Sequence, residues 1–347
     1  MIFAIGTLFF WAAFAAALWA ARGRVVFWPL LALGLLLLFD QAVIPGFFSL
    51  EARGGHLYGA RIDILNEGAK VMLLALGMTL VIATGGVDLS VGATMAIAGA
   101  VAAQCVVSAH LPALLGVAAA LGVAILAGAW NGLLVAVLRI PPIVATLILM
   151  VAGRGVAQLI TGGQIITFDN ALLAYLGNGW LLGLPFTLAL VLLAFGVTAV
   201  LVRRTALGLF IEAIGDSETA SRFTGIPAPT VKFFVYVFSG LCAGLAGLVA
   251  AGNIRGADAN HAGLYLELDA IIAAVVGGTS LTGGRFYLAG ALIGALLMQT
   301  LTTTLYALNV SADVATVPKA LAILVACLLQ SPKFRARLSR LRERPAS

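Results

Sequence analysis

The chain has 347 residues, of which 62% are hydrophobic and only 10% are charged, and its mean hydropathy is +1.10. Soluble domains carry about a quarter charged residues, so this composition excludes an ordinary water-soluble protein. The net charge of +6 indicates membrane topology rather than nucleic-acid binding, because basic residues collect in short cytoplasmic loops of membrane proteins.

Apolar runs long enough to cross a bilayer follow one another along the chain, and they lack the two-residue alternation of a membrane β-barrel. The sequence therefore predicts an all-α fold, a polytopic integral membrane helical bundle of about 10–11 transmembrane helices. The span that ends in Gly277-Gly278 is short, which is typical of a broken or re-entrant helix. The expected spans are residues 2–20, 26–44, 64–84, 91–109, 112–137, 143–160, 181–202, 231–251, 268–280, 286–308 and 314–330.

Lysine and arginine residues predict the orientation of the bundle. They crowd the loop 203–230 and the tail 331–347, so both segments are expected in the cytoplasm. Counting spans backward from that loop places the turn at Asp88 inside and residues 41–61 and 161–180 outside. The first apolar run fits a removable signal peptide poorly, and a true helix there would place the N-terminus outside.

Asp88 stands in a run rich in small residues, from Gly85 to Gly92, between two predicted spans. A carboxylate beside hydrocarbon costs several kcal/mol unless it faces a partner, a water-filled cavity or the membrane surface. Asp88 therefore belongs either to a functional site, as part of a gate or as a helix cap, or to an ordinary turn at the membrane surface.

A second glycine pair followed by a serine indicates a duplicated half, and interrupted helices are where transporters tend to build gates. Amide and guanidinium groups in or beside the spans either bond neighbouring helices or face a path. The expected gate and translocation path comprises Gly85, Gly86, Asp88, Ser90, Asn131, Arg154, Gln164, Gly277, Gly278 and Ser280.

The sequence contains no catalytic or metal-binding pattern. Its three cysteines and three histidines lie singly, and neither an H-E-x-x-H nor a G-x-S-x-G motif is present. We therefore expect no enzymatic activity, no metal and no cofactor. A phosphate-binding loop is also absent, so nucleotide energy would come from a separate polypeptide. The alternative is an ion-coupled secondary transporter of a small polar solute, for which Asp88 is the sole candidate carboxylate.

The loop 203–230 has the signals of a short capped helix. Ser217 suits the N-cap, Glu218 the first turn, and Gly225 followed by Pro227 the end. From the residues alone, this segment is either a solvated amphipathic connector or a docking site for a partner.

Several separated motifs, in order, resemble the permease subunits of bacterial ABC importers for ribose, xylose, arabinose and galactose. The resemblance extends from Val26 to Gln330, and the segments 75–90, 148–161 and 254–260 are most similar to galactofuranose permeases of that family. The motifs are Gly85-Gly-Val-Asp-Leu-Ser-Val-Gly92, Ile140-Pro-Pro-Ile-Val-Ala-Thr-Leu147, Gly153-Arg-Gly155, the loop from Ala213-Ile-Gly215 to Gly225-Ile226, and Gly277-Gly-Thr-Ser-Leu-Thr-Gly-Gly284.

The resemblance implies a ribose-type ABC importer permease fold in the bacterial inner membrane, and import of a monosaccharide, galactofuranose-like or a related pentose or hexose. Residues 25–330 would form the transmembrane domain, 1–24 an extra N-terminal apolar helix, and 331–347 a basic cytoplasmic tail. The implied partners are a cytosolic ABC ATPase, a periplasmic sugar-binding protein, a second permease subunit in a homo- or heterodimer, and membrane lipid, but no nucleic acid.

The resemblance also turns the loop 203–230 into an expected ATPase-coupling segment, in which small residues allow close approach and Phe223 anchors the contact. Its expected coupling residues are Glu212, Gly215, Glu218, Ala220, Arg222, Phe223 and Gly225. The residues expected to contact the periplasmic binding protein are Asp258, Asn260 and Glu267.

Overall fold

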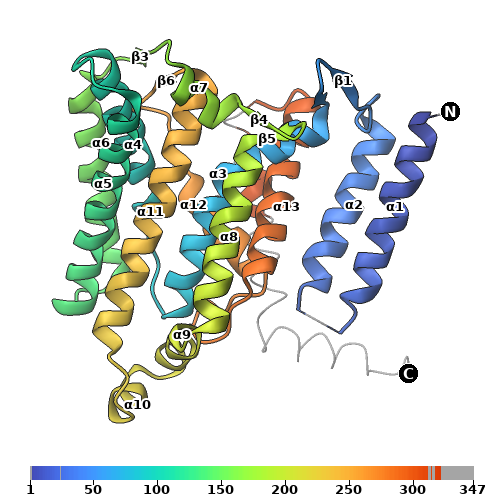
Figure 1. The fold of residues 1–347 in the computed structure, drawn as a ribbon. Helices are drawn as coiled ribbons and strands as arrows, with labels where there is room; N and C mark the ends of the chain where they lie inside the picture. Colours follow the sequence, from blue (N-terminus) through green and yellow to red (C-terminus); the bar gives the residue numbers. More distant parts are fainter. Residues whose placement is uncertain (1, 24, 312–313, 315–316, 322–347) are drawn as a thin grey trace, which may run out of the picture.

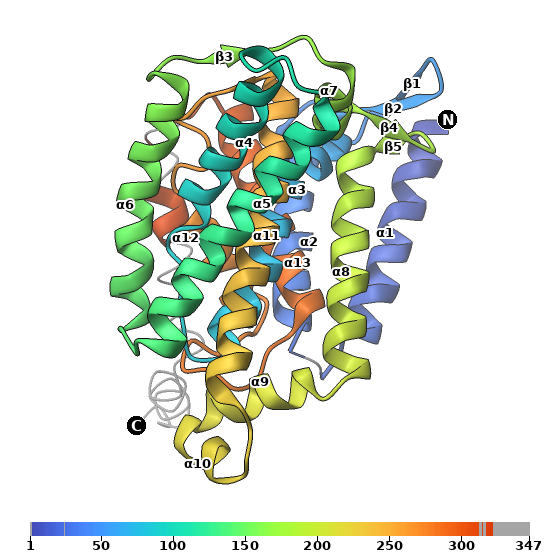
Figure 2. The same cartoon turned by 60° about the vertical axis from the view of Figure 1, so that its left-hand side comes forward.

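The computed structural model describes residues 2–23, 25–311, 314 and 317–321. Apolar helices run side by side through the molecule, and short loops join them at two opposite ends (Figures 1 and 2). The predicted tail 331–347 and most of the predicted span 314–330 lie outside the described residues.

The predicted polytopic helical bundle is confirmed, and each predicted span from 2–20 to 286–308 corresponds to a helix. Long uncharged runs form helices because the chain must satisfy its backbone hydrogen bonds internally in hydrocarbon. The helices are α1 Ile2–Ala20, α2 Phe27–Val43, α3 Ala60–Ala83, α4 Val91–Val107, α5 Ala113–Gly132 with its π-helical continuation η1 Leu133–Val137, α6 Pro142–Thr161, α8 Phe186–Arg204, α11 Ala228–Ile254, α12 Leu266–Val276 and α13 Leu288–Ala307.

The short elements separate the two ends of the bundle. Helices α9 (Leu207–Asp216) and α10 (Glu218–Phe223) lie at one end, and α7 (Ala171–Asn178) lies at the other (Figure 1). Three small antiparallel pairs share the end of α7: β1 Glu51–Arg53 with β2 His56–Tyr58, β3 Ile166–Thr167 with β6 Gly256–Ala257, and β4 Trp180–Leu181 with β5 Leu184–Pro185. The segments predicted to lie inside and outside are thus at opposite ends.

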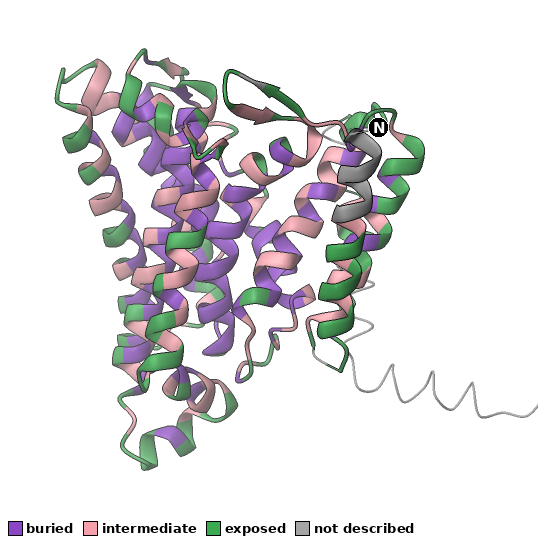
Figure 3. Cartoon of the chain, turned by 45° about the vertical axis from the view of Figure 1, so that its right-hand side comes forward, coloured by how far each residue is buried: buried purple, intermediate pink, exposed green. Residues whose placement is uncertain are grey.

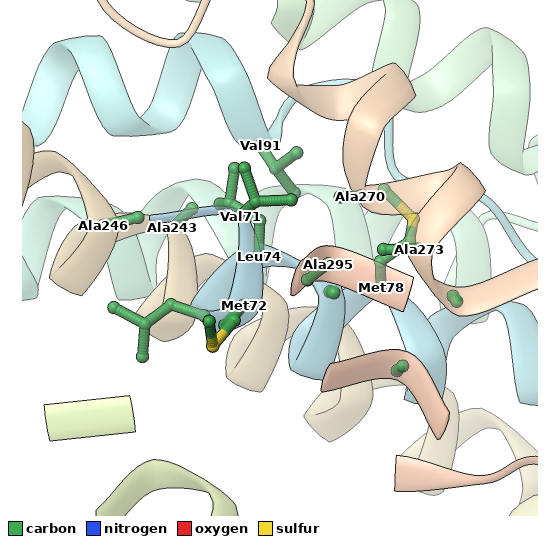
Figure 4. Packing of buried hydrophobic residues seen from close by; sticks show 14 of the residues in the cluster. Val71, Met72, Leu74, Met78, Val91, Ala243, Ala246, Ala270, Ala273 and Ala295 are labelled. Carbon is green, nitrogen blue, oxygen red and sulfur yellow. The ribbon is translucent and has the colours of Figure 1, made fainter. Parts of the chain in front are cut away.

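The core forms around α3, whose side chains are buried along most of its length (Figure 3). Val71, Leu74 and Met78 of α3 pack against alanines of α11, α12 and α13 (Figure 4). Small residues on these neighbours let the helices approach closely, as is usual inside membranes. By contrast, α6 and α8 expose apolar faces; Leu159 of α6, for example, is 83% exposed. These outward faces suit contact with lipid.

Two helices are short and begin inside the bundle. Helix α12 has 11 residues, which span about 16 Å and cannot cross a hydrocarbon core of about 30 Å. Its start lies against the start of α4, because a Cβ atom on Gly92 would come closer than 3.0 Å to the Gly263 carbonyl oxygen and to Glu267. The predicted broken helix is therefore present, and the meeting of two helix starts is a feature that the sequence did not predict.

Candidate functional site

Asp88 lies in the non-helical segment between α3 and α4, and it joins three parts of the bundle. Its Oδ1 accepts hydrogen bonds from the Ser90 hydroxyl at 2.7 Å and from Asn131 Nδ2 of α5 at 3.3 Å. Its Oδ2 accepts one from the Ser239 hydroxyl of α11 at 2.8 Å. Asn131 Nδ2 also donates to the Ser90 hydroxyl at 2.7 Å. This set of four residues, hereafter the Asp88 network, satisfies a carboxyl group that would otherwise be costly to bury.

Asp88 is only 1% exposed, so it is not a solvated turn residue. The expectation of a helix cap is correct in part. Asp88 accepts a hydrogen bond from the backbone N–H of Ser90 at 3.1 Å, but Ser90 is the N-cap residue and the first helical N–H groups receive no side-chain cap. Within the described residues no basic side chain bonds Asp88, so hydroxyl and amide donors alone satisfy it.

The backbone beside Asp88 is fixed as well. The Val87 carbonyl accepts hydrogen bonds from Thr146 of α6 at 3.3 Å and from the Tyr236 hydroxyl of α11 at 3.5 Å. A Cβ atom on Gly86 would lie 2.5 Å from that hydroxyl, so a larger residue there would displace the tyrosine ring. Gly85 has φ of +78°, a conformation that favours glycine. Both glycines of the first break, residues 84–90, therefore have a steric reason.

The second break, residues 277–284, is held differently. A Cβ atom on Gly277 would come closer than 3.0 Å to the backbone of Gly290 at the start of α13, so these two segments of the chain touch backbone to backbone. Gly278 has φ of +102°. The Ser280 hydroxyl bonds a neighbour in its own turn, Thr282, at 2.8 Å between hydroxyl oxygens. Among the described residues, no hydrogen bond joins Gly277, Gly278 or Ser280 to the Asp88 network, so the two glycine-rich breaks are held separately.

Arg154 of α6 holds the segment that leads into α12. Its guanidinium donates to the carbonyls of Ala259 at 3.0 Å and Ala262 at 2.6 Å. The charges of Glu267 and Asp258 act on it as well. Arg154 thus bonds within the bundle, one of the two roles that the sequence leaves open for it.

Asp258 and Asn260 lie together on the outer loop, as the sequence predicts. Asn260 accepts a hydrogen bond from Gln158 at 2.8 Å, and Asp258 pairs with His261 at 2.8 Å. Gln164 is exposed in the turn after α6, away from the Asp88 network. It therefore sits at the outer surface rather than inside the bundle.

Glu267 requires a correction, because it is 3% exposed and packs inside the bundle over Gly92. The first turn of α12 carries it inward, so it does not lie on the outer surface with Asp258. Asp269 in the same turn is also buried and bonds Lys319 at 2.7 Å. The sequence reasoning missed this ion pair, although a lysine within a predicted apolar span already calls for an acidic partner.

The loop between α8 and α11 has the predicted capped helix. Ser217 accepts a hydrogen bond from the backbone N–H of Ala220 at 3.2 Å. Glu218 pairs with Arg222 at 2.6 Å and also with Lys232. Burial alone would raise the pKa of Glu218, but the hydrogen bonds and charges of Lys232 and Arg222 outweigh it and lower the pKa. The carboxylate stays ionised and ties α10 to α11.

Fewer residues of this loop are exposed to a partner than the sequence predicts. Phe223 is 88% exposed at the tip, and Ala220 and Gly225 beside it are also exposed. Glu212 is half-buried on α9. Ile214 of α9 is buried in the chain's own core. Gly215 also packs against its own chain, so neither residue faces a partner.

A model of the family described as "Branched-chain amino acid transport system / permease component" matches residues 60–329. The chain belongs to this permease family. The described residues of the chain contain no group of three or more side chains that could hold a metal ion.

Curated relatives of the permease include sugar transporters. It is 51% identical to the galactofuranose transporter permease YtfT of Escherichia coli, over 91% of the permease and 94% of that protein. It is 39% identical to the fructose import permease FruF of Bifidobacterium longum (88% of each chain) and 38% identical to the ribose import permease RbsC of Escherichia coli (88% and 93%). No solved structure matches the chain.

These relatives are transporter permeases and not enzymes, as the sequence predicts for this chain. Among the described residues, six helices are long and apolar enough to cross a membrane, and shorter apolar helices accompany them. The permease is thus a multi-pass protein of the inner membrane.

Proposed function

We propose that the permease is the membrane subunit of an ABC importer that moves galactofuranose, or a closely related pentose or hexose, into the cell. The observation that supports this most strongly is the 51% identity to a galactofuranose permease over nearly the whole of both chains. The three named relatives take three different sugars, so the substrate class is a monosaccharide.

The substrate is tested by uptake in cells that lack this chain and receive it back on a plasmid. We expect labelled galactofuranose to accumulate only when the permease is present, and unlabelled ribose and fructose to compete weakly. Faster uptake of ribose or fructose than of galactofuranose would contradict the proposed sugar but leave the importer assignment intact.

We propose that α9 and α10 dock into a separate cytosolic ATPase, with Phe223 as the anchor. A phenylalanine that is 88% exposed at the tip of a capped helix is unfavourable in water and suits a cleft in a partner. The pairs of Glu218 with Arg222 and Lys232 keep the helix in place. The outer loop with Asp258 and Asn260 would receive the sugar-binding protein, and a second permease subunit would complete the path.

Phe223→Ala tests the docking. Removal of a buried anchor typically costs about 2 kcal/mol or more, so the variant is expected to bind the ATPase at least roughly tenfold more weakly. The matched control is Phe234→Ala, because Phe234 on α11 is also exposed but lies outside the loop. Co-purification of the ATPase with Phe223→Ala at the level of the unmodified permease would show that the loop is a solvated connector.

A further inference from the structure

Three backbone segments meet at Gly215, near the end of α9. A Cβ atom at this position would come closer than 3.0 Å, the limit that real Cβ atoms respect, to the carbonyl oxygen of Ala83 and to the backbone nitrogen of Gly284. Ala83 is the last residue of α3, and its carbonyl also accepts a hydrogen bond from the Gly284 N–H at 2.9 Å. The coupling loop, the end of α3 and the second break thus share one backbone contact, hereafter the Gly215 junction.

The contact requires glycine on both sides. A Cβ atom on Gly283 would lie 2.7 Å from the Gly215 carbonyl oxygen. Gly283 and Gly284 have φ of +91° and +86°, which other residues rarely adopt. The three glycines therefore allow an approach that side chains would prevent.

The junction adjoins both breaks. Ala83 directly precedes residues 84–90, which carry Asp88, and Gly283 and Gly284 close residues 277–284 before α13 begins. On the other side, α9 is followed at once by α10, whose N-cap is Ser217 and whose tip carries Phe223. Only the end of α9 therefore separates α10 from the contact with the segments before α4 and after α12.

Side-chain packing makes α9 move together with these segments. Ile211 and Ile214 of α9 are buried in one apolar cluster with Leu80 and Ala83 of α3 and Leu288 of α13. Packed interiors transmit displacement because they resist compression. The coupling loop is thus attached to the ends of both breaks and is not a loose connector.

We propose that Gly215 is a positioning residue that passes movement of the ATPase-docked loop to both glycine-rich breaks at once. This inference rests on the proposed docking of α9 and α10. It assigns Gly215 to a contact within the chain, whereas Phe223 remains the contact with the ATPase. Loss of Gly215 would then separate ATP hydrolysis from transport without releasing the ATPase.

The first test leaves Gly215 intact and follows the second break directly. Leu281 is exposed within this break, so Leu281→Cys, in a chain lacking Cys105, Cys242 and Cys327, reports its surroundings through the rate of labelling by a thiol reagent. In the assembled transporter we expect this rate to change severalfold when ATP is trapped in the ATPase. An unchanged labelling rate in a complex that retains its ATPase would overturn the role proposed for Gly215. It would leave the docking proposal intact.

The second test is Gly215→Ala, with Gly196→Ala on α8 as control because a Cβ atom there meets nothing within 4 Å. We expect Gly215→Ala to keep its ATPase and its hydrolysis, but to lose at least about tenfold in sugar moved per ATP and the labelling change at position 281. Transport at the control rate would overturn the inference, as would release of the ATPase, because Gly215 would then belong to the docking surface. If the alanine variant does not assemble, the labelling test above still decides.

Discussion

The two glycine-rich breaks have similar sequences but are held in place by different forces. In the first, residues 84–90, side chains from α5 and α11 converge on Asp88 and form a buried hydrogen-bond network. In the second, residues 277–284, backbone meets backbone at Gly277 and Gly283, and the hydroxyl of the single serine bonds Thr282 in its own turn. Similar motifs therefore do not indicate equivalent sites.

The kind of contact that holds each break determines which substitutions the break should tolerate. A hydrogen-bond network fails when an acceptor is removed, because buried donors then lose their partners. A backbone contact fails when a Cβ atom is added, because nothing in it can move aside cheaply.

The largest effect is expected for Asp88→Leu. It leaves the hydroxyls of Ser90 and Ser239 and the amide of Asn131 without their shared acceptor, and each buried unsatisfied group costs about 1–3 kcal/mol. Asp88→Asn keeps one acceptor oxygen and should lose less. Sugar uptake, normalised to the amount of inserted permease, measures both. Normal transport by a correctly inserted leucine variant would refute a role for the network.

A smaller effect is expected for Gly277→Ala in the second break. The added methyl group collides with the backbone at Gly290, and overpacking of this kind typically costs about 1–3 kcal/mol. Gly122→Ala on α5 is the control, since a Cβ atom there meets nothing within 4 Å. The unfolding temperature in detergent should fall for the first variant only. Equal unfolding temperatures of the two variants would show that the second break can accommodate a Cβ atom at residue 277.

The smallest effect is expected for Ser280→Ala, and its contrast with Ser239→Ala distinguishes the two breaks. Ser239→Ala removes one hydrogen bond to the buried Asp88 and should cost about 1.5–3 kcal/mol. Ser280→Ala removes a contact with exposed Thr282 and should stay within about 0.5 kcal/mol. Thermal unfolding of both variants measures the contrast. If Ser280→Ala were as damaging as Ser239→Ala, the second break would also depend on side-chain bonds.

Much of this fold could be predicted from the sequence because hydrocarbon imposes long apolar helices. The first span, 2–20, matches α1 residue for residue, and the cap at Ser217 follows from local chemistry. The short helix α7 escaped notice because its N-cap, Asn170, lies in a polar stretch that reads as a loop. Local signals therefore predicted the long apolar helices and the short helix capped by Ser217, but not α7.

The site was less predictable because its contacts join distant parts of the chain. The motif around Asp88 draws attention to this residue, but Ser239 lies 151 residues away and no local signal links the two. The sequence predicts Glu267 on the outer surface, because its polar neighbours resemble an outer loop. Hydropathy alone does not show that α12 begins inside the bundle. The pairing of Lys319 with Asp269 likewise required the tertiary structure.

The source of energy tests the central claim most directly. The permease, its ATPase and its binding protein are reconstituted in liposomes, and labelled galactofuranose uptake is measured with and without ATP, and with ionophores that collapse ion gradients. The account predicts uptake that requires ATP and the ATPase and that persists when every ion gradient is collapsed. Uptake driven by an ion gradient through the permease alone would contradict it and would make the chain a secondary transporter.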